Sequence, residues 1–506
     1  MDNAARQTAF KEAVDRNDFT EFNKQYIDFL KQFDSFAQAF SITSTEVHVT
    51  SAIFGRHNFY LKQTNDAQAQ ELLDKARAAS QKFAIVPVQE RLKFLKILKS
   101  KIDKYQDDIA LAITADTGKP IDLSKGEMTK GNEWFQFAAN QAALQLVGTK
   151  PLGVAQVISA YNYPYALAIS GIVGALAAGN SVVVSAPLKA PNWVFPFMQA
   201  AMEAMEEYGI QGLIQTSIGV NNSLTAAVDI VHFVGGDRAG EQLRKSRGAK
   251  KIIREMGGSN VVVVMASALE KQSADDIANI IYGGFGPAAG QRCTAPRMLC
   301  AQNGAEEAVK ALEALCEKGP LPHQDIGNPF APGVKIGPLV DKSAHQKMQG
   351  AINLATELGA RVYGKMGVSD KVRPKTPDTV SLWVNPVVID WSAVDMSKGD
   401  NAARVHECVT NEIFGPLLHI LPTVKTLDEA IAVTGRLDTH GLAGAIFTAS
   451  NDDENYYRQH TRITSIMRNA APKDQSPKFE HGHPGMPRIG GSHHFQRYAD
   501  LRQTPR

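Results

Sequence analysis

Residues 290–295, which read Gly-Gln-Arg-Cys-Thr-Ala, place a thiol in a loop that a glycine opens and that small residues follow. A cysteine thiolate attacks carbonyl carbon atoms and forms an acyl intermediate that must then be hydrolysed. Hydrolysis needs a base, and burial can raise the pKa of a carboxylate toward the working pH. Residues 254–260, Arg-Glu-Met-Gly-Gly-Ser-Asn, supply a carboxylate upstream. Cys293 is therefore the candidate nucleophile and Glu255 the candidate base for covalent catalysis on a carbonyl compound.

A third polar residue, Asn162, lies where a predicted strand ends and a helix begins, in residues 159–164, Ser-Ala-Tyr-Asn-Tyr-Pro. Attack on a carbonyl creates a tetrahedral oxyanion, whose hydrogen-bond donors must be fixed before the reaction. At the carboxyl end of a strand, a side-chain amide can point into the cleft where ligands bind. The alternative is that Asn162 caps the helix that follows it.

These segments resemble the aldehyde dehydrogenase superfamily, whose members carry a Gly-Gln-x-Cys loop, a Glu-Leu-Gly-Gly turn and a Pro-Trp-Asn-Phe-Pro segment. Here Met256 replaces the leucine, and the motifs keep the family's order over residues 65–470. A lone cysteine is more often a small buried hydrophobe, and a lone glutamate a solvated charge, but the surrounding motifs reverse that preference. The resemblance implies that Cys293 attacks an aldehyde, that Asn162 and the backbone N–H of the cysteine hold the oxyanion, and that Glu255 activates water.

Further segments resemble the cofactor site of the family. Residues 233–240 end a strand and open a helix, and glycines there let a phosphate approach the helix N-terminus. Residues 411–416, Asn-Glu-Ile-Phe-Gly-Pro, are similar to the family's Glu-Glu-Ile-Phe-Gly-Pro, whose second Glu holds the nicotinamide ribose and whose Phe packs near the ring. A carboxylate suits the ribose because it accepts hydrogen bonds from both hydroxyls. The cofactor-binding residues that the resemblance implies are Ile158, Tyr161, Ser185, Leu188, Lys189, Gly235, Gly236, Met256, Glu412 and Phe414.

The adenosine end departs from the family pattern. Where the family has Lys-Pro, with a lysine that grips the adenosine ribose, residues 185–187 read Ser-Ala-Pro. NAD-preferring relatives often carry a glutamate shortly afterwards, which repels a 2′-phosphate, whereas this chain has Leu188 and then Lys189. Loss of the negative charge removes a penalty against NADP, and a lysine can pair with the phosphate. We expect NAD or NADP as cofactor, with a preference for NADP; alternatively Lys189 points into solvent and both bind.

The substrate is expected to be a small-molecule aldehyde. The Gly-Gln-basic-Cys-Thr-Ala form is similar to relatives that oxidise acidic or CoA-linked semialdehydes, including those of aromatic-ring degradation. If Arg292 faces the substrate it can bind a carboxylate or keep the thiol ionised; the alternative is that it faces away. A CoA-acylating enzyme is a second hypothesis, against which Glu255 argues because acylating relatives generally lack that base. A third is a non-catalytic scaffold that binds nucleotide or protein.

Strand and helix patterns alternate along the chain. A strand at 154–160, a helix at 165–178 and a strand at 181–185 form one βαβ unit, which implies a parallel sheet. Further strands are predicted at 212–218, 230–234, 260–264, 382–389, 417–422 and 443–448. Helices over residues 67–116 end at a Thr-Gly-Lys-Pro stop. We therefore predict an α/β protein of aldehyde dehydrogenase-like fold, with a Rossmann-type cofactor domain, an α/β catalytic domain and a small bridging or oligomerisation element.

The predicted domain boundaries follow from these patterns and from the resemblance. Residues 1–50 are predicted to form an N-terminal helical extension that lies on its own protein; the alternative is that it docks to a partner. The cofactor domain takes residues 51–132 and 152–256, and the catalytic domain takes 257–455. Residues 133–151 and 456–506 form the bridging element, through which relatives assemble as homodimers or homotetramers.

Overall composition limits the partners and the compartment. A net charge of +2 gives no broad attraction to nucleic acid or to anionic membranes, and the longest apolar stretch, 166–184, is interrupted by polar residues and glycines. The four cysteines show no Cys-x-x-Cys spacing, which fits a reducing cytoplasm. No metal is expected, because the histidine-rich segment 481–494 lacks cysteines and a well-placed carboxylate set.

Two segments are expected to be loops that differ from those of typical relatives. The number of residues between Cys293 and Glu412 in the sequence is larger than in typical relatives. A polar surface loop at residues 364–380 would account for this difference. Near the C-terminus, residues 484–491 replace a glycine-rich run of the family, which puts closure of that loop over the substrate in doubt.

Overall fold

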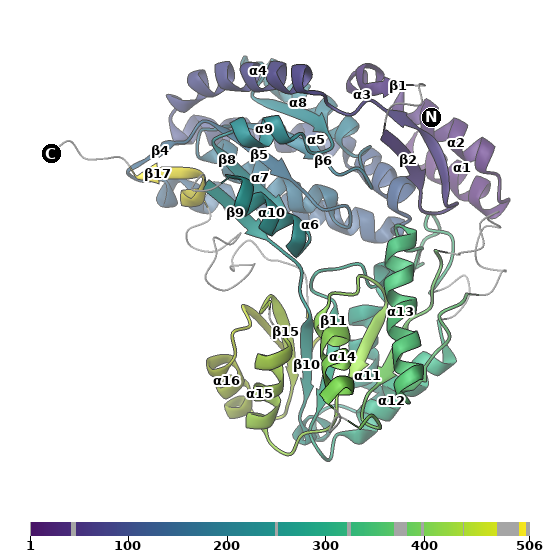
Figure 1. The fold of residues 1–506 in the computed structure, drawn as a ribbon. Helices are drawn as coiled ribbons and strands as arrows, with labels where there is room; N and C mark the ends of the chain where they lie inside the picture. The colour runs from purple at the N-terminus through teal and green to yellow at the C-terminus, as the bar shows by residue number, and fades with distance from the viewer. Residues whose placement is uncertain are drawn as a thin grey trace. The chain divides into compact units, whose positions relative to one another are not determined.

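The computed structural model describes residues 2–41, 47–247, 251–320, 325–368, 382–395, 399–438, 440–472 and 495–501. They belong to two compact units that divide between Glu255 and Met256, and residues 495–501 belong to the first unit. Both units contain a sheet of mainly parallel strands with helices packed on it, as the α/β prediction requires (Figure 1). Most of segment 364–380 and nearly all of 472–493, including His481 and residues 484–491, lie outside the described residues.

The first unit is built on a five-stranded parallel sheet of order β7-β6-β5-β8-β9. Short Val- and Ile-rich runs that are buried on both faces form most of its strands, as parallel sheets require. Because the order reverses between β5 and β8, the carboxyl ends of these two strands form the switch point where doubly wound folds bind ligands. The strands are β5 (Val154–Ile158), β6 (Ser181–Ala186), β7 (Ile214–Ile218), β8 (Ile230–Val234) and β9 (Lys251–Glu255).

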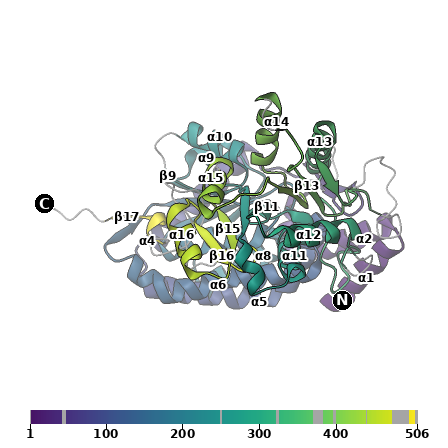
Figure 2. The ribbon, with the colours of Figure 1, turned by 90° about the horizontal axis from the view of Figure 1, so that it is seen from below.

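Helices connect these strands in the alternation that the sequence predicts. They are α7 (Pro164–Ala177), α8 (Val194–Tyr208), α9 (Asn222–Ala227) and α10 (Asp237–Arg247). Before the sheet come α4 (Asp66–Ala84), α5 (Val88–Thr117) and α6 (Ile121–Gln145). Helix α5 ends at the predicted stop, where Gly118 takes the left-handed conformation with φ 70°. The long helices α5 and α6 pack against each other (Figure 2). Helix α6 also packs against α7.

Three helices precede this core: α1 (Asn3–Asp15), α2 (Phe19–Leu30) and α3 (Asp34–Ala39). They lie where the sequence predicts a helical extension, and they bury an aromatic cluster that includes Phe10, Phe22, Tyr26 and Phe29. A short antiparallel sheet of order β1-β3-β2 follows, which the sequence analysis does not predict. Its strands are β1 (Phe40–Ser41), β2 (Val47–Ser51) and β3 (Arg56–Leu61). These helices are thus packed on their own protein.

A buried carboxyl group joins the extension to the core. Asp116, near the end of α5, accepts hydrogen bonds from the Tyr26 hydroxyl at 2.7 Å, the Asn192 backbone N–H at 2.9 Å and the Asn192 amide at 2.6 Å. Burial raises the pKa of Asp116 to about 7 despite these donors. The folded protein therefore binds a proton here at pH values where the unfolded chain has already lost it.

This raised pKa predicts a specific dependence of stability on pH. Because the folded-state pKa lies above the unfolded value of about 3.9, the contribution of Asp116 to the free energy of unfolding falls as pH rises from about 4 to about 7. The melting temperature of Asp116→Asn, taken relative to the original protein, should therefore rise between pH 5 and pH 8. Thermal unfolding at several pH values measures this difference, and a difference that stays constant would contradict the prediction.

The second unit is built on a seven-stranded sheet of order β12-β13-β14-β11-β10-β15-β16. All neighbours in it are parallel except β12 and β13. A continuous apolar cluster joins this sheet to α11 and α12 and includes Val262, Leu299, Ile281 and Leu312. The strands are β10 (Asn260–Val264), β11 (Pro296–Ala301), β12 (Arg361–Tyr363), β13 (Val387–Asp390), β14 (Leu417–Ile420), β15 (Ala443–Phe447) and β16 (Ser465–Arg468).

The helices of the second unit lie between these strands. They are α11 (Ala274–Phe285), α12 (Glu306–Lys318), α13 (Lys342–Leu358), α14 (Gly399–Thr410), α15 (Leu427–Leu437) and α16 (Asn451–His460), with short 3₁₀ turns η1 (Ala266–Glu270) and η2 (Pro287–Gly290).

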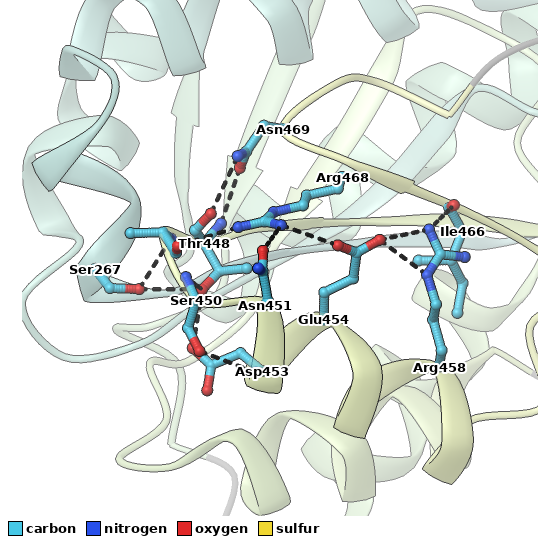
Figure 3. Close-up of polar contacts among 11 residues, drawn as sticks. Ser267, Thr448, Ser450, Asn451, Asp453, Glu454, Arg458, Ile466, Arg468 and Asn469 are labelled. Atoms are coloured by element: carbon cyan, nitrogen blue, oxygen red, sulfur yellow. Dashed lines mark hydrogen bonds and ion pairs between the residues drawn. The ribbon is translucent and has the colours of Figure 1, made fainter.

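Strand β16 is held firmly at its end. Arg468 donates to Asn451, to Glu454 at 3.1 Å and to the Ala449 carbonyl at 3.0 Å (Figure 3). Asn469, which has a positive φ of 51°, exchanges two hydrogen bonds with the backbone of Thr448, at 2.9 and 3.0 Å. These contacts fix the junction between β15, α16 and β16 just before the described part of this unit ends.

The C-terminal stretch returns to the first unit. There the turn η3 (Phe495–Tyr498) leads into β17 (Ala499–Leu501), which pairs antiparallel with β4 (Thr149–Pro151). The Tyr498 carbonyl accepts a hydrogen bond from the Asn180 amide at 2.8 Å. The pairing joins the two segments that the sequence assigns to a bridging element, whose role in assembly stays a prediction. Among the described helices, none is both long enough and apolar enough to cross a membrane.

Candidate active site

The cysteine loop begins with an unusual backbone. Ala288, Ala289 and Gly290 all have left-handed conformations, with φ values of 54°, 51° and 65°. Such values are costly for alanine, so the surrounding structure must hold them. A Cβ atom at Gly290 would lie 2.3 Å from the Gly415 carbonyl oxygen, so only glycine fits there. The turn brings Cys293, which is partly exposed, to the end of η2.

Two buried side chains hold this turn. The Gln291 amide donates to the Ala288 and Pro338 carbonyls, both at 3.2 Å, and accepts from the Val340 N–H at 2.9 Å. Arg297, which is 2% exposed, donates to the Gly290 carbonyl at 2.7 Å and to the Gly415 carbonyl at 2.6 Å. A guanidinium is well suited to such bridging because its donors lie in a rigid plane. Arg297 therefore ties the cysteine loop to the loop at 411–416.

Asn260, at the start of β10, fixes the cysteine itself. Its amide donates to the Cys293 carbonyl at 2.7 Å and the Ala295 carbonyl at 2.8 Å, and its oxygen accepts from the Ala443 N–H at 3.1 Å. A Cβ atom at Gly258 would lie 2.9 Å from the Cys293 carbonyl oxygen. The glycine turn that begins after Met256 thus passes directly beside the nucleophile loop.

Glu412 lies against the same turn. Its carboxylate accepts a hydrogen bond from the Gly258 N–H at 3.1 Å, and a Cβ atom at Gly257 would lie 2.1 Å from its Oε2 atom. The ring of Phe414 lies 5.6 Å from the Arg297 guanidinium. Within the second unit the structure therefore brings the predicted residues Cys293, Glu412 and Phe414 together with the glycine turn that follows Met256.

The first unit gathers the other predicted residues at one edge of its sheet. Asn162 follows β5, and Glu255 is the last residue of β9 and is 1% exposed. Strand β8 lies between these two strands, and its last residue, Val234, pairs with Glu255. The Gly235 N–H donates to the Glu255 carbonyl at 3.1 Å. The predicted oxyanion donor, phosphate turn and base thus follow neighbouring strand ends.

Asn162 does not serve as the cap of α7. The N–H groups of Tyr165 and Ala166, from which a capping side chain would accept, both donate to Glu127 instead, at 2.8 and 3.0 Å. Tyr163, the residue at the cap position, makes no side-chain capping bond. The alternative reading of Asn162 as a helix cap is therefore wrong for this structure.

The model of the aldehyde dehydrogenase family matches residues 41–503 of this chain. The chain belongs to the aldehyde dehydrogenase family. It is 28% identical over 419 residues to an alpha-ketoglutarate semialdehyde dehydrogenase of Haloferax volcanii. This match covers 78% of this chain and 81% of that protein. It is 25% identical to a probable acylating methylmalonate-semialdehyde/malonate-semialdehyde dehydrogenase of Dictyostelium discoideum, over 78% of this chain and 75% of that one.

Solved structures share the fold of this aldehyde dehydrogenase. The crystal structure of a betaine aldehyde dehydrogenase from Staphylococcus aureus in complex with NAD+ superposes with a TM-score of 0.78 at 21% identity. The match covers 95% of this chain and 98% of that chain. The predicted aldehyde dehydrogenase-like fold is confirmed.

The four cysteines of this aldehyde dehydrogenase are all free thiols, and three of them sit in unreactive surroundings. Burial raises the pKa of Cys300 and of Cys316 to about 12 and that of Cys408 to about 11. A thiol with so high a pKa is almost entirely protonated at neutral pH and is a poor nucleophile. Cys293 remains the candidate, because its loop is the one that Asn260, Gln291 and Arg297 hold in place.

The adenosine end of the cofactor region carries mixed features. Gly236 opens α10, and a Cβ atom there would meet nothing within 4 Å, so the helix N-terminus is accessible to a phosphate. Ser185 is fully buried, and its hydroxyl bonds to Gln156 and to Ser217, each at 2.8 Å. Leu188 is 42% exposed. The Lys189 ammonium lies 5.2 Å from the centre of the ring of Tyr161, which follows β5 in the chain. The open glycine turn at the switch point fits a dinucleotide.

The Arg292 side chain forms hydrogen bonds within the second unit. Its guanidinium donates to the carbonyls of Gly283 and Gly284 in the last turn of α11. These carbonyls are acceptors that the helix itself leaves unsatisfied, so the arginine completes the end of the helix. The idea that Arg292 recognises a substrate carboxylate gains no support from this geometry.

Among the described residues no group of His, Cys, Asp and Glu side chains could hold a metal.

Sequence reasoning missed the residues that hold the site. Asn260 and Arg297 are buried polar side chains in otherwise apolar strands, which is a signal that a sequence can show. Their partners, however, are backbone carbonyls in distant segments, and no motif reveals those.

Proposed function

We propose that this aldehyde dehydrogenase oxidises an acidic semialdehyde to the dicarboxylic acid, with NAD or NADP as hydride acceptor and water as acyl acceptor. The observation that carries the proposal is the fixed cysteine loop, in which Asn260 and Arg297 hold the backbone on both sides of Cys293. The substrate class is supported by the relatives described above, whose names identify semialdehydes of carboxylic acids.

The proposed chemistry has two stages. The Cys293 thiolate forms a bond to the aldehyde carbon, while Asn162 and the Cys293 N–H stabilise the negative oxygen. A bound nicotinamide supplies the acceptor for the hydride that leaves this carbon, which becomes a thioester. Glu255 then takes a proton from water, the hydroxide attacks the thioester, and the carbon–sulfur bond breaks to release the acid and the thiolate.

For the cofactor, we propose that Glu412 accepts hydrogen bonds from the nicotinamide ribose and that Phe414 packs near the ring. The backbone at Gly235 and Gly236 would receive the pyrophosphate at the N-terminus of α10. Lys189 supports a preference for NADP, because its charge can pair with a 2′-phosphate and no glutamate stands at Leu188 to repel one.

A second candidate function is CoA-dependent acylation, in which CoA instead of water resolves the thioester. The name of the Dictyostelium relative favours it, since that protein is described as acylating. Glu255 favours water, because a buried carboxylate at this position supplies the base that hydrolysis needs.

One experiment separates these functions. Purified protein is given NAD or NADP with a neutral aldehyde, an acidic semialdehyde and a CoA-linked semialdehyde, and formation of reduced nicotinamide is followed with and without CoA. Turnover of the acidic semialdehyde without CoA supports the hydrolytic enzyme. Comparison of the turnover rates with NAD and with NADP tests the preference for NADP. Turnover only when CoA is added would establish the acylating enzyme. If no reduced nicotinamide forms under any condition, the remaining hypothesis is the non-catalytic scaffold.

The oligomeric state and the cellular compartment are also part of the proposal. We propose a homodimer or homotetramer that forms through the element containing β4 and β17, and a cytoplasmic location that suits the four free thiols. Light scattering coupled to size-exclusion chromatography measures the mass of the assembly directly.

A further inference from the structure

Two opposite charges are buried beneath the loop that carries Asn162. Lys119 follows the end of α5, Glu127 lies in the second turn of α6, and their side chains are 5% and 0% exposed. The Lys119 ammonium donates to the Glu127 carboxylate at 2.6 Å. Taking charges out of water is costly, and hydrophobic residues would often pack as stably in their place. Such a pair therefore calls for a reason beyond stability.

Both members of the pair hold the backbone that leads from Asn162 into α7. Lys119 donates to the Asn162 carbonyl at 3.2 Å, and its ammonium lies 3.4 Å from the centre of the Tyr163 ring. Glu127 accepts from the N–H groups of Tyr165 and Ala166 through one oxygen, at 2.8 and 3.0 Å. The ion pair joins these two grips into one connected network.

Glu127 also takes over a task for which Asn162 is chemically suited. An asparagine just before a helix commonly caps it by accepting from the first free N–H groups. Here those N–H groups are already bonded to a carboxylate, which also complements the positive end of the α7 dipole. The Asn162 amide is therefore not drawn onto the helix end.

Packing keeps α6 and α7 in a fixed relation. A Cβ atom at Gly131 of α6 would lie 2.4 Å from the Tyr165 ring, so the two helices touch through a glycine. The Tyr165 hydroxyl donates to Asn132 at 2.7 Å. Glu127 therefore reaches the start of α7 from a helix whose position is set by close contact.

We infer that Lys119 and Glu127 are positioning residues that fix the Asn162 amide for the oxyanion, with Glu127 capping α7 in place of Asn162. The inference rests on the proposed function, in which Asn162 stabilises the negative oxygen. It assigns to Lys119 and Glu127 no contact with substrate or cofactor. Their effect is on geometry, and misplacement of a catalytic group by about 1 Å can lower a rate about 100-fold.

The test uses Glu127→Gln and Lys119→Met in the full-length protein. Glutamine keeps the size and an oxygen for the two N–H groups, but its amide nitrogen would face the Lys119 ammonium, and the network would open. We expect kcat for the acidic semialdehyde to fall about 10- to 100-fold, because an oxyanion donor is worth about 10²–10³ in kcat and these changes displace it without removing it. The affinity for the nucleotide and the rate at which iodoacetamide alkylates Cys293 should stay within about twofold of the original protein, since neither depends on the placement of Asn162.

A matched control lies on the same helix. Glu133 forms an exposed ion pair with Lys130 at 2.9 Å, with side chains 37% and 48% exposed. Glu133→Gln makes the same chemical change on α6 without touching the Asn162 loop, and it should leave kcat unchanged. Thermal unfolding of every variant shows whether a loss of activity follows from a loss of fold.

The deciding measurement is a double-mutant cycle with Asn162→Ala. If Glu127 acts through Asn162, then Glu127→Gln should change kcat by less than about twofold once Asn162 is alanine. Equal losses on both backgrounds would overturn the inference, as would an unchanged kcat in both Glu127→Gln and Lys119→Met. An Asn162→Ala variant with full activity would instead overturn the proposed role of Asn162, so the two failures are distinguishable. If Glu127→Gln does not fold, Lys119→Met carries the same cycle.

Discussion

Replacement of Cys293 with serine is expected to lower kcat/KM for aldehyde oxidation by at least about 10³-fold, because the residue forms the covalent bond on which both stages depend. A serine hydroxyl has about the same size, but at neutral pH it is almost never ionised. The hydrogen bond from the Asn260 side-chain amide reaches only the backbone carbonyl of Cys293, so the loop should keep its shape. Steady-state formation of reduced nicotinamide measures the loss.

The control for this variant is Cys408→Ser. Cys408 is partly exposed on α14 and is a free thiol like Cys293, but burial raises its pKa to about 11. It should therefore be dispensable. Mass spectrometry of protein quenched during turnover should find the acyl group on the peptide that contains Cys293. Full activity of Cys293→Ser, or an acyl group on another cysteine, would refute the assignment of the nucleophile.

Glu255→Gln should block the second stage and spare the first. Without a base to activate water, steady-state turnover is expected to fall by about 10²–10⁴-fold, whereas one equivalent of reduced nicotinamide should still form rapidly in each active site. The backbone carbonyl that accepts from the Gly235 N–H is unchanged by the substitution, so the phosphate turn should persist. Rapid mixing gives the size of the burst, and the slow phase gives the hydrolysis rate.

Three results would speak against this role for Glu255. Loss of the burst together with the slow phase would mean that Glu255 is needed for acylation or for structure. A steady state that is unaffected would mean that another group activates water. A steady state in the original protein that depends on added CoA would move the assignment to the acylating enzyme. A variant of similar chemistry at Glu270, in the turn η1 of the second unit, provides the control because that residue lies outside the predicted site.

The strand ends and helix starts that contiguous motifs mark could be predicted from the sequence, because each is a local property. Cys293 and Glu412 have neighbours whose types specify the turn, and β5, β6 and β8 are short apolar runs bounded by turn residues. The strands β11 and β16 were missed. Arg297 interrupts the apolar pattern of the first, and the second is only four residues long with polar residues, Ser465 and Arg468, at both ends.

Residues that act through distant partners could not be predicted in the same way. The Thr-Gly-Lys-Pro segment indicates a helix stop, and Gly118 fulfils that function, yet the bond from Lys119 to the Asn162 carbonyl spans 43 residues. Glu127 reads as one charge on an amphipathic helix, which is usually a solvated face. Its burial depends on the packing of α6 against α7, which is a tertiary property.

The cap on α7 also has a consequence for the order in which the protein assembles. Helix α4 carries its own cap, since Asn65 accepts from the Gln68 N–H three residues away, and such a cap forms together with its helix. The cap on α7 comes from a residue 38 positions upstream, so closing it carries the entropic cost of ordering a long loop and requires α6 to dock first. During synthesis or refolding, helical structure can thus precede the final shape of the loop around Asn162, which we expect to form only after α6 has docked on α7.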